Sequence, residues 1–505
     1  MIMMKRTVLI LASILLSIAS EAQSQSFKIG KWTEIRNSIV KELNRSYADT
    51  LPVDRMERAA VDAMLSQLDP YTVYIPVEED EDLQMMVSKS YGGIGAVIYK
   101  PDVDDYVYIN EPYEGSPAAR AGLQCGDRIV TIDGQSTLGL NASESSSRMK
   151  GAPHTEVRFH VIKVRTGEET DVAITRERIH LPDIQYSAIL PDGKTGYILQ
   201  TGFTEGVGEE LRSTVAELKA KGAQRIVLDL RGNGGGLLTE AVNIVSVFVP
   251  KGSLVVSQKG IRFPEPVECR TEREPLDTGI PLAVLVDSGS ASASEIVTGA
   301  LQDYGRATVL GRRTYGKGLV QSIRPLPHDG KMKVTVAKYY TPSGRCVQDT
   351  KGLTPDVELA PMEYSRLTYS LVMYGVIDNY MLEYVKTHDS IPAVEDFHLS
   401  ETEYEDFIKY ALTKEFDYRS GAKTYFDRMR EELRRDKLED SMKESLDAME
   451  KALNMEKEEF LRLKKDEIIP FIEEEIVCRY HYQKGAVQLR LRYDTQLREA
   501  LEKLQ

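Results

Sequence analysis

The spacing of apolar residues divides the chain into regions with different predicted secondary structure. Between residues 27 and about 90, apolar residues recur at helical spacing in WTEIRNSIVKELNRSY and MERAAVDAMLSQL, before a break at Asp69-Pro70. Between residues 91 and 177, short runs such as YVYIN and EVRFHVIKV are separated by turn residues and predict β-strands. One helical piece, SPAARAGL, and a second candidate, ESSSRMKG, lie among these strands.

Strand-like and helix-like runs alternate over residues 185–362. RIVLDL and PLAVLVD are typical of buried strands, whereas VGEELRSTVAELKAKG and ASEIVTGALQDYG are helix candidates. This alternation predicts an α/β layered domain. Residues 363–505 are predicted largely helical and polar, since 26 acidic and 21 basic residues fall within 401–505. Such density favours solvated helices with many i,i+4 ion pairs.

The first 22 residues predict a secretory signal peptide. A basic start, MIMMKR, precedes 13 apolar or small residues from Thr7 to Ala19, and Ser20 and Ala22 complete a site for cleavage after Ala22. The apolar run is shorter than the ~20 residues that span a membrane, although an uncleaved anchor is the alternative. We expect a protein exported to the periplasm or cell envelope, with no stable membrane span in the mature chain.

Composition narrows the function classes. A chain of 505 residues predicts about three or four domains, and 42% hydrophobic with 28% charged residues is ordinary for soluble proteins. A net charge of -14 offers no basic face for nucleic acid. The four cysteines, widely spaced and without a CxxC pair, predict neither a disulfide scaffold nor a zinc site. We expect no metal and no cofactor.

A serine-rich segment, Gly289–Glu295, lies between a predicted strand and a predicted helix. A serine at such a turn can present its hydroxyl to a cleft, where N–H groups of the helix start stabilise an oxyanion. Ser292 and Glu295 also fit S-x-x-E, the helix capping box, and on this stretch alone the capping box is the favoured interpretation.

A lysine between glycines follows, in Gly311–Lys317. This segment matches the start of a phosphate-binding loop, but Gly318 stands where Ser or Thr should hold Mg²⁺, and GLVQSIRPLP reads as strand or loop. If residues 317–321 are extended, Lys317 and Gln321 share a face, because side chains alternate along a strand. A third candidate is Leu228–Gly236, whose glycine cluster is either half of an oxyanion hole or a plain turn.

No histidine is well placed to serve as a catalytic base. Of seven histidines only His328 lies in the α/β region, in a PHDG turn, and there is no HExxH motif. A lysine base is the remaining option, and it must be neutral to accept a proton. Burial lowers a lysine pKa, and Tyr315, Leu319 and Val320 could supply such surroundings.

The stretch from Leu68 to Asp356 resembles the carboxyl-terminal processing peptidases, the tail-specific serine proteases of family S41 that carry a PDZ domain and a Ser-Lys dyad. Seven blocks match in order: LDPYTVYIP, YGGIGAVI, GSPAARAGLQCGDRIVTIDG, LDLRGNGGGLL, GSASASEI, GRRTYGKGLVQ and YYTPSGRCVQ. The resemblance implies a multidomain α/β and α+β fold. Its parts are an N-terminal helical region (27–90), a PDZ domain (91–177), a serine peptidase core of the ClpP/crotonase-like type (185–362) and a C-terminal helical extension (363–505). The extension is not part of the shared core.

The resemblance also implies catalytic roles. Ser292, the middle serine of SASAS, is the expected nucleophile, Lys317 the general base, and Gln321 the residue that orients the lysine. Gly234 replaces a proline common in the family and should loosen its turn. The sequence thus predicts acyl transfer by a Ser-Lys dyad.

Backbone N–H groups carry the remaining implied roles. Those of Ala293 and Gly235 are the expected oxyanion donors, with Gly236 as the alternative to Gly235. In the PDZ domain, the expected hold on a substrate's terminal carboxylate comes from the N–H groups of Gly93, Ile94 and Gly95.

The expected function is therefore an exported serine endopeptidase that cleaves proteins near or from their C-terminus. Its PDZ domain is expected to capture protein or peptide substrates with apolar C-termini by strand addition. A homodimer through the terminal helices, an adaptor protein and gating by the PDZ domain stay open. The alternatives are a non-catalytic PDZ-containing envelope scaffold, a nucleotide-dependent enzyme using Gly311–Lys317, and a trypsin-like PDZ protease, in which Gly234 would occupy the place of the GNSGG serine.

Overall fold

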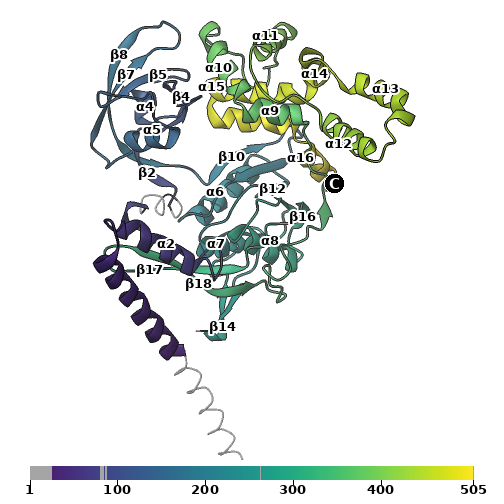
Figure 1. Ribbon diagram of the computed structural model, residues 1–505. Coiled ribbons are helices and arrows are strands. Elements are labelled where there is room, and N and C mark those ends of the chain that lie inside the picture. The colour runs from purple at the N-terminus through teal and green to yellow at the C-terminus, as the bar shows by residue number, and fades with distance from the viewer. Residues whose placement is uncertain (1–24, 80–84, 86–87, 262, 504–505) are drawn as a thin grey trace, which may run out of the picture. The chain divides into compact units, whose positions relative to one another are not determined.

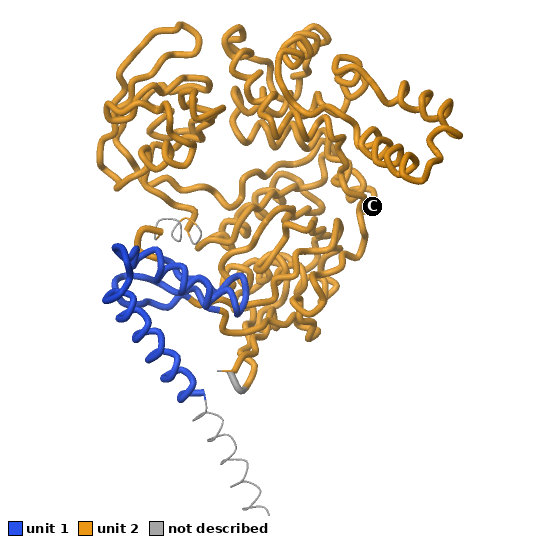
Figure 2. Tube along the Cα trace, viewed as in Figure 1, with its two compact units in different colours: residues 1–75, 323–334 blue, residues 76–322, 335–505 orange. Residues whose placement is uncertain are grey.

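The computed structural model describes residues 25–79, 85, 88–261 and 263–503, so the predicted signal peptide (1–22) lies outside the described residues. The chain divides into two compact units (Figure 2). Unit 1 comprises residues 1–75 and 323–334, and unit 2 comprises residues 76–322 and 335–505. No helix among the described residues is long and apolar enough to cross a membrane.

Unit 1 is mainly helical. Residues 25–46 form one helix and α2 (Val53–Leu65) a second, as the apolar spacing predicts. The break at Asp69 is an Asx turn, because its Oδ1 accepts the N–H groups of Tyr71 (2.8 Å) and Thr72 (2.9 Å). The prediction of helix up to residue 90 is wrong at β1 (Val73–Ile75), where aromatic and β-branched side chains favour a strand. This strand pairs antiparallel with residues 331–333 of β18.

The expected PDZ domain, in unit 2, contains a sheet with strand order β3-β4-β5-β7-β8, and β6 pairs with β5. The helix candidate SPAARAGL forms only four helical residues, since Ser116 caps its start (3.2 Å to the Ala119 N–H) and Gly122, at φ 78°, follows its end. The second candidate is confirmed as α5. The bounds are β3 (Ala96–Tyr99), β4 (Val107–Pro112), α4 (Pro117–Arg120), β5 (Arg128–Ile132), β6 (Gln135–Ser136), α5 (Ala142–Met149), β7 (Glu156–Ile162) and β8 (Glu169–Thr175).

A two-stranded antiparallel ribbon leads into and out of the PDZ domain. Its strands are β2 (Ser90–Gly93) and β9 (Glu177–His180). At its base, Lys89 Nζ pairs with the buried carboxylate of Asp183 at 2.9 Å. The two chain crossings between the PDZ domain and the following sheet therefore run side by side.

The α/β alternation predicted for residues 185–362 is present as a six-stranded sheet of order β10-β11-β12-β15-β16-β19. Strands β10, β12 and β16 of this sheet are labelled in Figure 1. Strand β10 is antiparallel to β11, and the other neighbours are parallel. The elements are β10 (Ile184–Ile189), β11 (Thr195–Gln200), α6 (Val207–Ala220), β12 (Arg225–Asp229), α7 (Leu238–Phe248), β15 (Leu282–Val286), α8 (Ala293–Asp303), β16 (Thr308–Gly311) and β19 (Val357–Glu358).

The central strands are buried on both faces, as continuous apolar runs such as RIVLDL predict. Leu228 and Val284 pack with residues of α6, α7 and α8. On the opposite face, Val227 and Leu285 pack with Leu497 of the C-terminal helix α16. The C-terminal helical region thus completes the core of the sheet.

A second sheet was not predicted from the sequence. It joins β13 (Leu254–Gly260), β14 (Phe263–Arg270), β17 (Leu319–Pro325) and β18 (Lys331–Tyr340). Proline at positions 264 and 266 argues against a strand in sequence, because proline cannot donate to a ladder, and β14 lies at the edge of the strand order, where proline is tolerated.

Residues after 363 are largely helical, as predicted. The predicted i,i+4 ion pairs include Lys423–Asp427 and Arg462–Glu458. The segment α15 has non-helical backbone at Tyr482 (φ 58°, ψ -172°), where two helices meet at a kink. The helices are α9 (Arg366–Met373), α10 (Val376–Thr387), α11 (Glu401–Leu412), α12 (Gly421–Arg435), α13 (Lys443–Leu453), α14 (Lys457–Leu463), α15 (Lys465–Tyr493) and α16 (Thr495–Lys503).

Candidate active site

Ser292 lies at the sharp turn between β15 and α8, where a parallel strand ends at its carboxyl edge. Its backbone has φ 56° and ψ -112°, a region that L-residues rarely adopt. Such a conformation costs of the order of 1–3 kcal/mol and persists only where surrounding bonds enforce it. The preceding loop supplies such bonds, since Asp287 Oδ1 accepts the N–H groups of Gly289 (2.8 Å) and Ser290 (3.1 Å).

The fully buried carboxylate of Glu295 joins the serine segment to the lysine segment. Its Oε2 accepts the backbone N–H groups of Ser292 and Lys317, both at 2.9 Å. Its Oε1 accepts the Gly316 N–H (2.7 Å) and the Thr314 hydroxyl (2.6 Å). Glu295 therefore does supply the carboxylate of the capping box, but it also fixes the two expected catalytic residues to one another through their backbones.

Burial raises the pKa of Glu295, and its four hydrogen-bond donors oppose that shift. A buried carboxylate without partners would be strongly disfavoured, so the donors make its charged form tolerable. The Lys317 N–H is one of these donors, so the carboxylate binds the backbone of the lysine segment.

Lys317 is half-buried and precedes strand β17 by two residues. The buried Tyr339 links this segment to the serine from a second side: its N–H donates to Gly318 O (3.0 Å) and its hydroxyl to Ser292 O (3.2 Å). Gln321 lies in β17, and its Nε2 donates to Thr335 Oγ1 at 3.3 Å. A strand follows Lys317, as the sequence indicates, whereas a phosphate-binding loop requires a helix.

The glycine turn after β12 brings Gly235 against the serine. A Cβ added at Gly235 would lie 2.6 Å from Ala291 O, 2.8 Å from Ala293 N and 2.9 Å from Ser292 Cβ. Gly236 instead lies against Phe203, with which it forms a parallel β-bridge. Of the two glycines that the sequence left open, Gly235 is the one beside Ser292.

Asn233 fastens this turn to the serine loop. Its carbonyl oxygen accepts the Ala291 N–H (3.0 Å) and the Ser294 hydroxyl (2.8 Å), and its side-chain Nδ2 donates to Gln200 O (2.8 Å). Its Oδ1 accepts the N–H of Gly235 at 2.9 Å. In this structure the expected oxyanion donor at Gly235 is therefore engaged by its own turn.

The expected carboxylate-binding loop lies where ribbon strand β2 enters the PDZ sheet. The carbonyl of Ile94 accepts the Ala118 N–H, and that of Gly95 accepts the Tyr113 N–H, each at 2.9 Å. In a trans peptide the next N–H points the opposite way, so the Gly95 N–H faces away from α4. Gly95 has φ 73°, and a Cβ there would lie 2.6 Å from Ser116 Cβ.

Several residues of the site were not singled out from the sequence. Tyr339 carries no local signal, because its partners are distant in the chain, and so are the Asn233 partners outside its own turn. Glu295 did carry a signal, the S-x-x-E spacing, but that spacing indicates only the bond to Ser292. Among the described residues, no three His, Cys, Asp or Glu side chains gather as a metal site would require.

Comparison with known proteins places three segments in described families. The model of Peptidase family S41 matches residues 194–359, a PDZ domain model matches residues 108–163, and the C-terminal helical domain of a probable PDZ-protease matches residues 367–504. The third match covers the region that the resemblance in the sequence left unexplained.

Individual proteins are similar to most of this chain. A carboxy-terminal-processing protease of Bartonella bacilliformis is 31% identical over 365 residues, which cover 70% of this chain and 82% of that protein. A probable CtpA-like serine protease of Staphylococcus aureus is 36% identical over 331 residues, so the match spans 65% of each chain. Among solved structures, the photosystem II D1 C-terminal processing protease is 28% identical, with a TM-score of 0.40 over 66% of this chain and 87% of that one.

The matched segments define a multidomain protein with a PDZ domain, an α/β core and a C-terminal helical domain. The chain belongs to peptidase family S41, the carboxy-terminal-processing proteases.

Proposed function

We propose that this protein is a serine endopeptidase that cleaves proteins near or from their C-terminus through Ser292 and Lys317. The observation that carries the proposal is the Glu295 carboxylate, which accepts the backbone N–H groups of both residues. Family membership supplies the reaction class, and this bond pair explains how two segments 25 positions apart are held as one site.

In the proposed mechanism, neutral Lys317 removes the proton of Ser292 and the serine oxygen attacks a substrate carbonyl. The tetrahedral intermediate collapses, the proton passes from Lys317 to the leaving amine, and water then hydrolyses the acyl-enzyme. Gln321 would orient the lysine amine. Ala293 is the first residue of α8, where backbone N–H groups lack a partner within the helix, which suits it as an oxyanion donor.

Gly235 is the proposed second donor. Its N–H must exchange Asn233 Oδ1 for the substrate oxygen, because one N–H cannot serve both well. The exchange favours the transition state, since a developing oxyanion is a stronger acceptor than a neutral amide oxygen.

The PDZ domain is proposed to capture the substrate tail. Strand β3 lies at the end of the strand order, and among the described residues it pairs only with β4. A peptide can therefore add to its free edge, while N–H groups of the Gly93–Gly95 loop receive the terminal carboxylate. A substrate ending in an apolar residue should have a KM about tenfold below that of the same substrate with a C-terminal amide, which lacks the anion.

Export to the cell envelope is proposed from the N-terminal sequence. N-terminal sequencing of protein recovered from the cell envelope should begin at Gln23. A chain that retains its first residues in that fraction would contradict cleavage after Ala22.

A homodimer through the terminal helices is also proposed. Trp32 and Ile39 are 64% and 54% exposed and lie seven residues apart, so they share one face of the helix at 25–46. Light scattering of the mature chain and of Trp32→Ser should show a dimer and a monomer, and equal masses would remove this proposal. The same measurement with an added adaptor would detect a further partner.

The test of the peptidase is cleavage of an unstructured protein with an apolar C-terminus. The mature chain should cleave it, and Ser292→Ala and Lys317→Ala should not. Lys338→Ala is the matched lysine control, because its side chain is 45% exposed and pairs with Asp349. Cleavage that survives in both site variants would overturn the assignment. Absence of cleavage by every form, including a form with PDZ ligand added, would favour the non-catalytic scaffold.

A further inference from the structure

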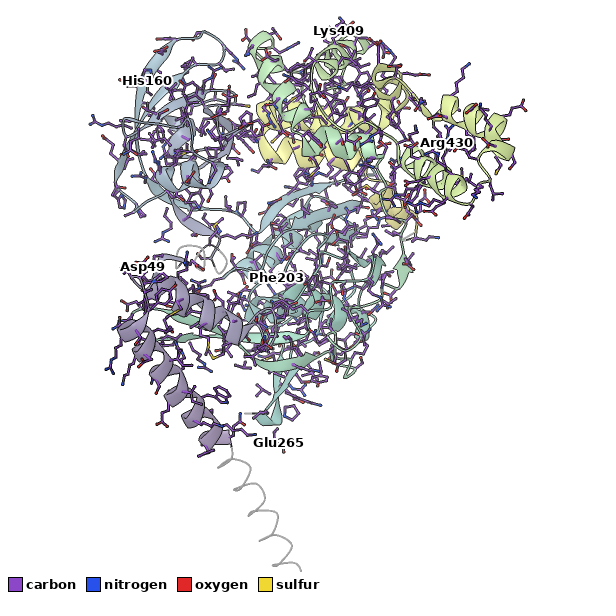
Figure 3. The ribbon with its side chains drawn as sticks, in the orientation of Figure 1. Asp49, His160, Phe203, Glu265, Lys409 and Arg430 are labelled. Atoms are coloured by element: carbon purple, nitrogen blue, oxygen red, sulfur yellow. The ribbon has the colours of Figure 1, made fainter. Side chains whose placement is uncertain are left out.

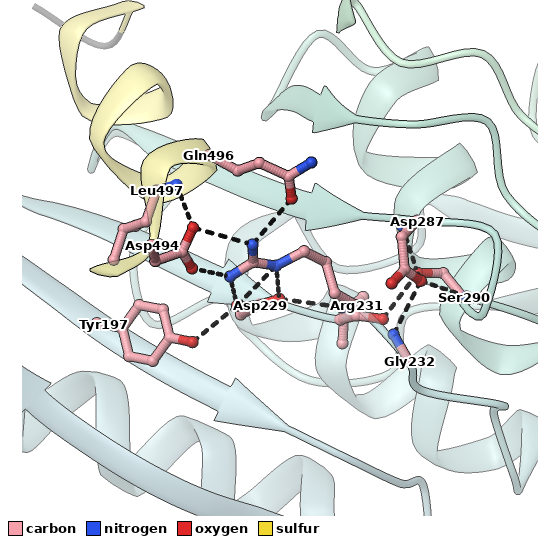
Figure 4. Close-up of polar contacts among 10 residues, drawn as sticks. Tyr197, Asp229, Arg231, Gly232, Asp287, Ser290, Asp494, Gln496 and Leu497 are labelled. Carbon is pink, nitrogen blue, oxygen red and sulfur yellow. Dashed lines mark hydrogen bonds and ion pairs between the residues drawn. The ribbon is translucent and has the colours of Figure 1, made fainter. Parts of the chain in front are cut away.

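Arg231 stands at the start of the glycine turn, two residues after the end of β12 (Figure 4). On one side its guanidinium binds Asp229, with Nε at 3.0 Å from Oδ1 and Nη2 at 2.5 Å from Oδ2. On the other side it reaches Asp494, with Nη2 at 2.5 Å from Oδ2, and Gln496, with Nη1 at 3.0 Å from Oε1. The arginine of the core is thus held between its own strand and the C-terminal helical region.

Both C-terminal partners are themselves fixed. Asp494 is 5% exposed, and its Oδ1 accepts the Leu497 N–H (2.8 Å) in the first turn of α16. Gln496 is 7% exposed and donates its Nε2 to Ala360 O (2.7 Å). Because these bonds hold both side chains in place, Asp494 and Gln496 form a rigid binding site for the Arg231 guanidinium.

This guanidinium binding site lies close to the loop before Ser292. Next to Arg231, the Gly232 N–H donates to Asp287 Oδ1 at 2.9 Å (Figure 4). The carbonyl of Leu230 accepts the Ser290 hydroxyl at 2.8 Å. A displacement of Arg231 therefore acts on two of the bonds that join the turn to the loop before Ser292.

This turn needs an external anchor more than most turns do. Four of its residues are glycines, at positions 232, 234, 235 and 236, and glycine loses more conformational freedom on ordering than any other residue. An arginine fork that meets carboxylates with several parallel bonds is well suited to restrict such a segment, because its geometry is planar and rigid.

We propose that the C-terminal helical region positions the glycine turn (residues 232–236), with Asp494 and Gln496 as positioning residues that act through Arg231. The region then belongs to the catalytic assembly and is not only a platform for partners. Its effect on the chemical step rests on the proposed peptidase function, whereas its effect on the order of the turn does not.

The variant that isolates this role is Asp494→Asn. The amide oxygen can still accept the Leu497 N–H, so the start of α16 is preserved, but the charge is lost and an N–H₂ group faces the guanidinium. Arg231→Lys weakens the same interaction by changing the cation, because an ammonium lacks the planar, multidentate geometry of a guanidinium. Asp447→Asn is the control, since Asp447 is an exposed carboxylate of the same helical region that contacts only Arg430 in the described chain.

Two readouts follow. Hydrogen exchange of the full mature chain should show amides of residues 232–236 exchanging about tenfold faster in Asp494→Asn and Arg231→Lys, with α8 and α16 unchanged. In cleavage assays kcat should fall about tenfold, with KM within twofold, because the turn contributes to the transition state. A peptide aldehyde, which the serine oxygen attacks to form a tetrahedral adduct while its proton passes to Lys317, should lose the same factor in affinity. The corresponding peptide alcohol has no carbonyl for the serine to attack, so its affinity should be unchanged.

The outcomes separate the two proposals. Unchanged exchange at 232–236 in both variants overturns this inference whether or not the chain cleaves anything. Faster exchange that extends equally into α8 and α16 also overturns it, because the residues would then be merely structural. A wild-type chain that cleaves nothing counts against the proposed function, and the exchange result still decides the role of Asp494.

Discussion

The proposed active-site turns of the core and the helical hairpin of α12 and α13 both contain charged residues with several partners, yet they differ in what those partners are. Glu295 of α8 is fully buried, and three of its four donors are backbone N–H groups. Arg430 of α12, labelled in Figure 3, lies at a partly solvated surface. Within the described part of the chain it pairs with side chains alone, those of Glu439, Asp447 and Glu450.

This difference decides how much each network constrains the chain. A backbone N–H has no rotamers, so a carboxylate bound to several of them fixes the path of the chain. Two long side chains that pair in water lose rotamer entropy and gain little, because solvent and salt screen their attraction. The core network should therefore control both structure and catalysis, and the hairpin network neither.

The largest expected effect comes from Glu295→Gln. One carboxylate oxygen becomes an N–H₂ donor, which faces a backbone N–H group in either orientation of the amide. Either Ser292 and Lys317 or Gly316 and Thr314 then lose their common acceptor. We expect kcat to fall by at least ~10²-fold, because small misplacements of reacting groups cost that much. The free energy of unfolding should fall by about 3 kcal/mol, as is usual for a broken buried charge network. Glu439→Gln on the hairpin is the matched control, and equal losses in both variants would erase the distinction.

The next effect tests the close approach of the glycine turn. Gly235→Ala would place a methyl group 2.6 Å from Ala291 O at φ 96°, so the turn must move away from the serine. We expect about a 10²-fold loss of kcat from a displaced oxyanion donor. Gly234→Ala is the control, because a Cβ there meets nothing within 4 Å. Activity in Gly235→Ala within twofold of that control would show that the turn takes no part in the chemistry.

Sequence reasoning located the parts of this site better than the bonds between them. Apolar runs such as RIVLDL and PLAVLVD predict buried parallel strands, so the positions of Ser292 and Gly235 at carboxyl ends of neighbouring strands follow from pattern. The role of Glu295 does not follow, because two of its donors come from residues 316 and 317, whose approach depends on the whole fold. Strand β14 was missed for a related reason: its prolines oppose a ladder, and only its edge position makes them acceptable.

Asp277 combines features of the two networks, because it binds one charged side chain and two backbone N–H groups. Asp277 binds the Lys219 side chain, and this bond, aided by the backbone N–H groups of Gly279 and Ile280 against the opposing effect of burial, lowers its pKa to about 2. A depressed carboxyl pKa stabilises the fold at pH values above the unfolded pKa, and that contribution is lost as pH falls through the folded pKa.

We therefore expect Asp277→Asn to lower the free energy of unfolding by about 1 kcal/mol at pH 7, a value discounted for the partial exposure of the pair. The difference from wild type should shrink below about pH 4 and vanish near pH 2. Urea unfolding at pH 7, 4 and 2.5 measures it. A difference that stays constant over this range would mean that packing, and not the charge, carries the effect.

The smallest effect is expected on the hairpin itself. Arg430→Gln removes all of the ion pairs that this side chain makes, but its partners stay solvated and need no replacement. We expect the melting temperature to change by about 1 °C or less in low salt, and by less still in 1 M salt, where the Debye length is about 3 Å. Cleavage kinetics should equal those of wild type. A loss of activity comparable to that of Glu295→Gln would show that surface charge on α12 reaches the catalytic turns, and the contrast between fixed backbone partners and mobile side-chain partners would then fail.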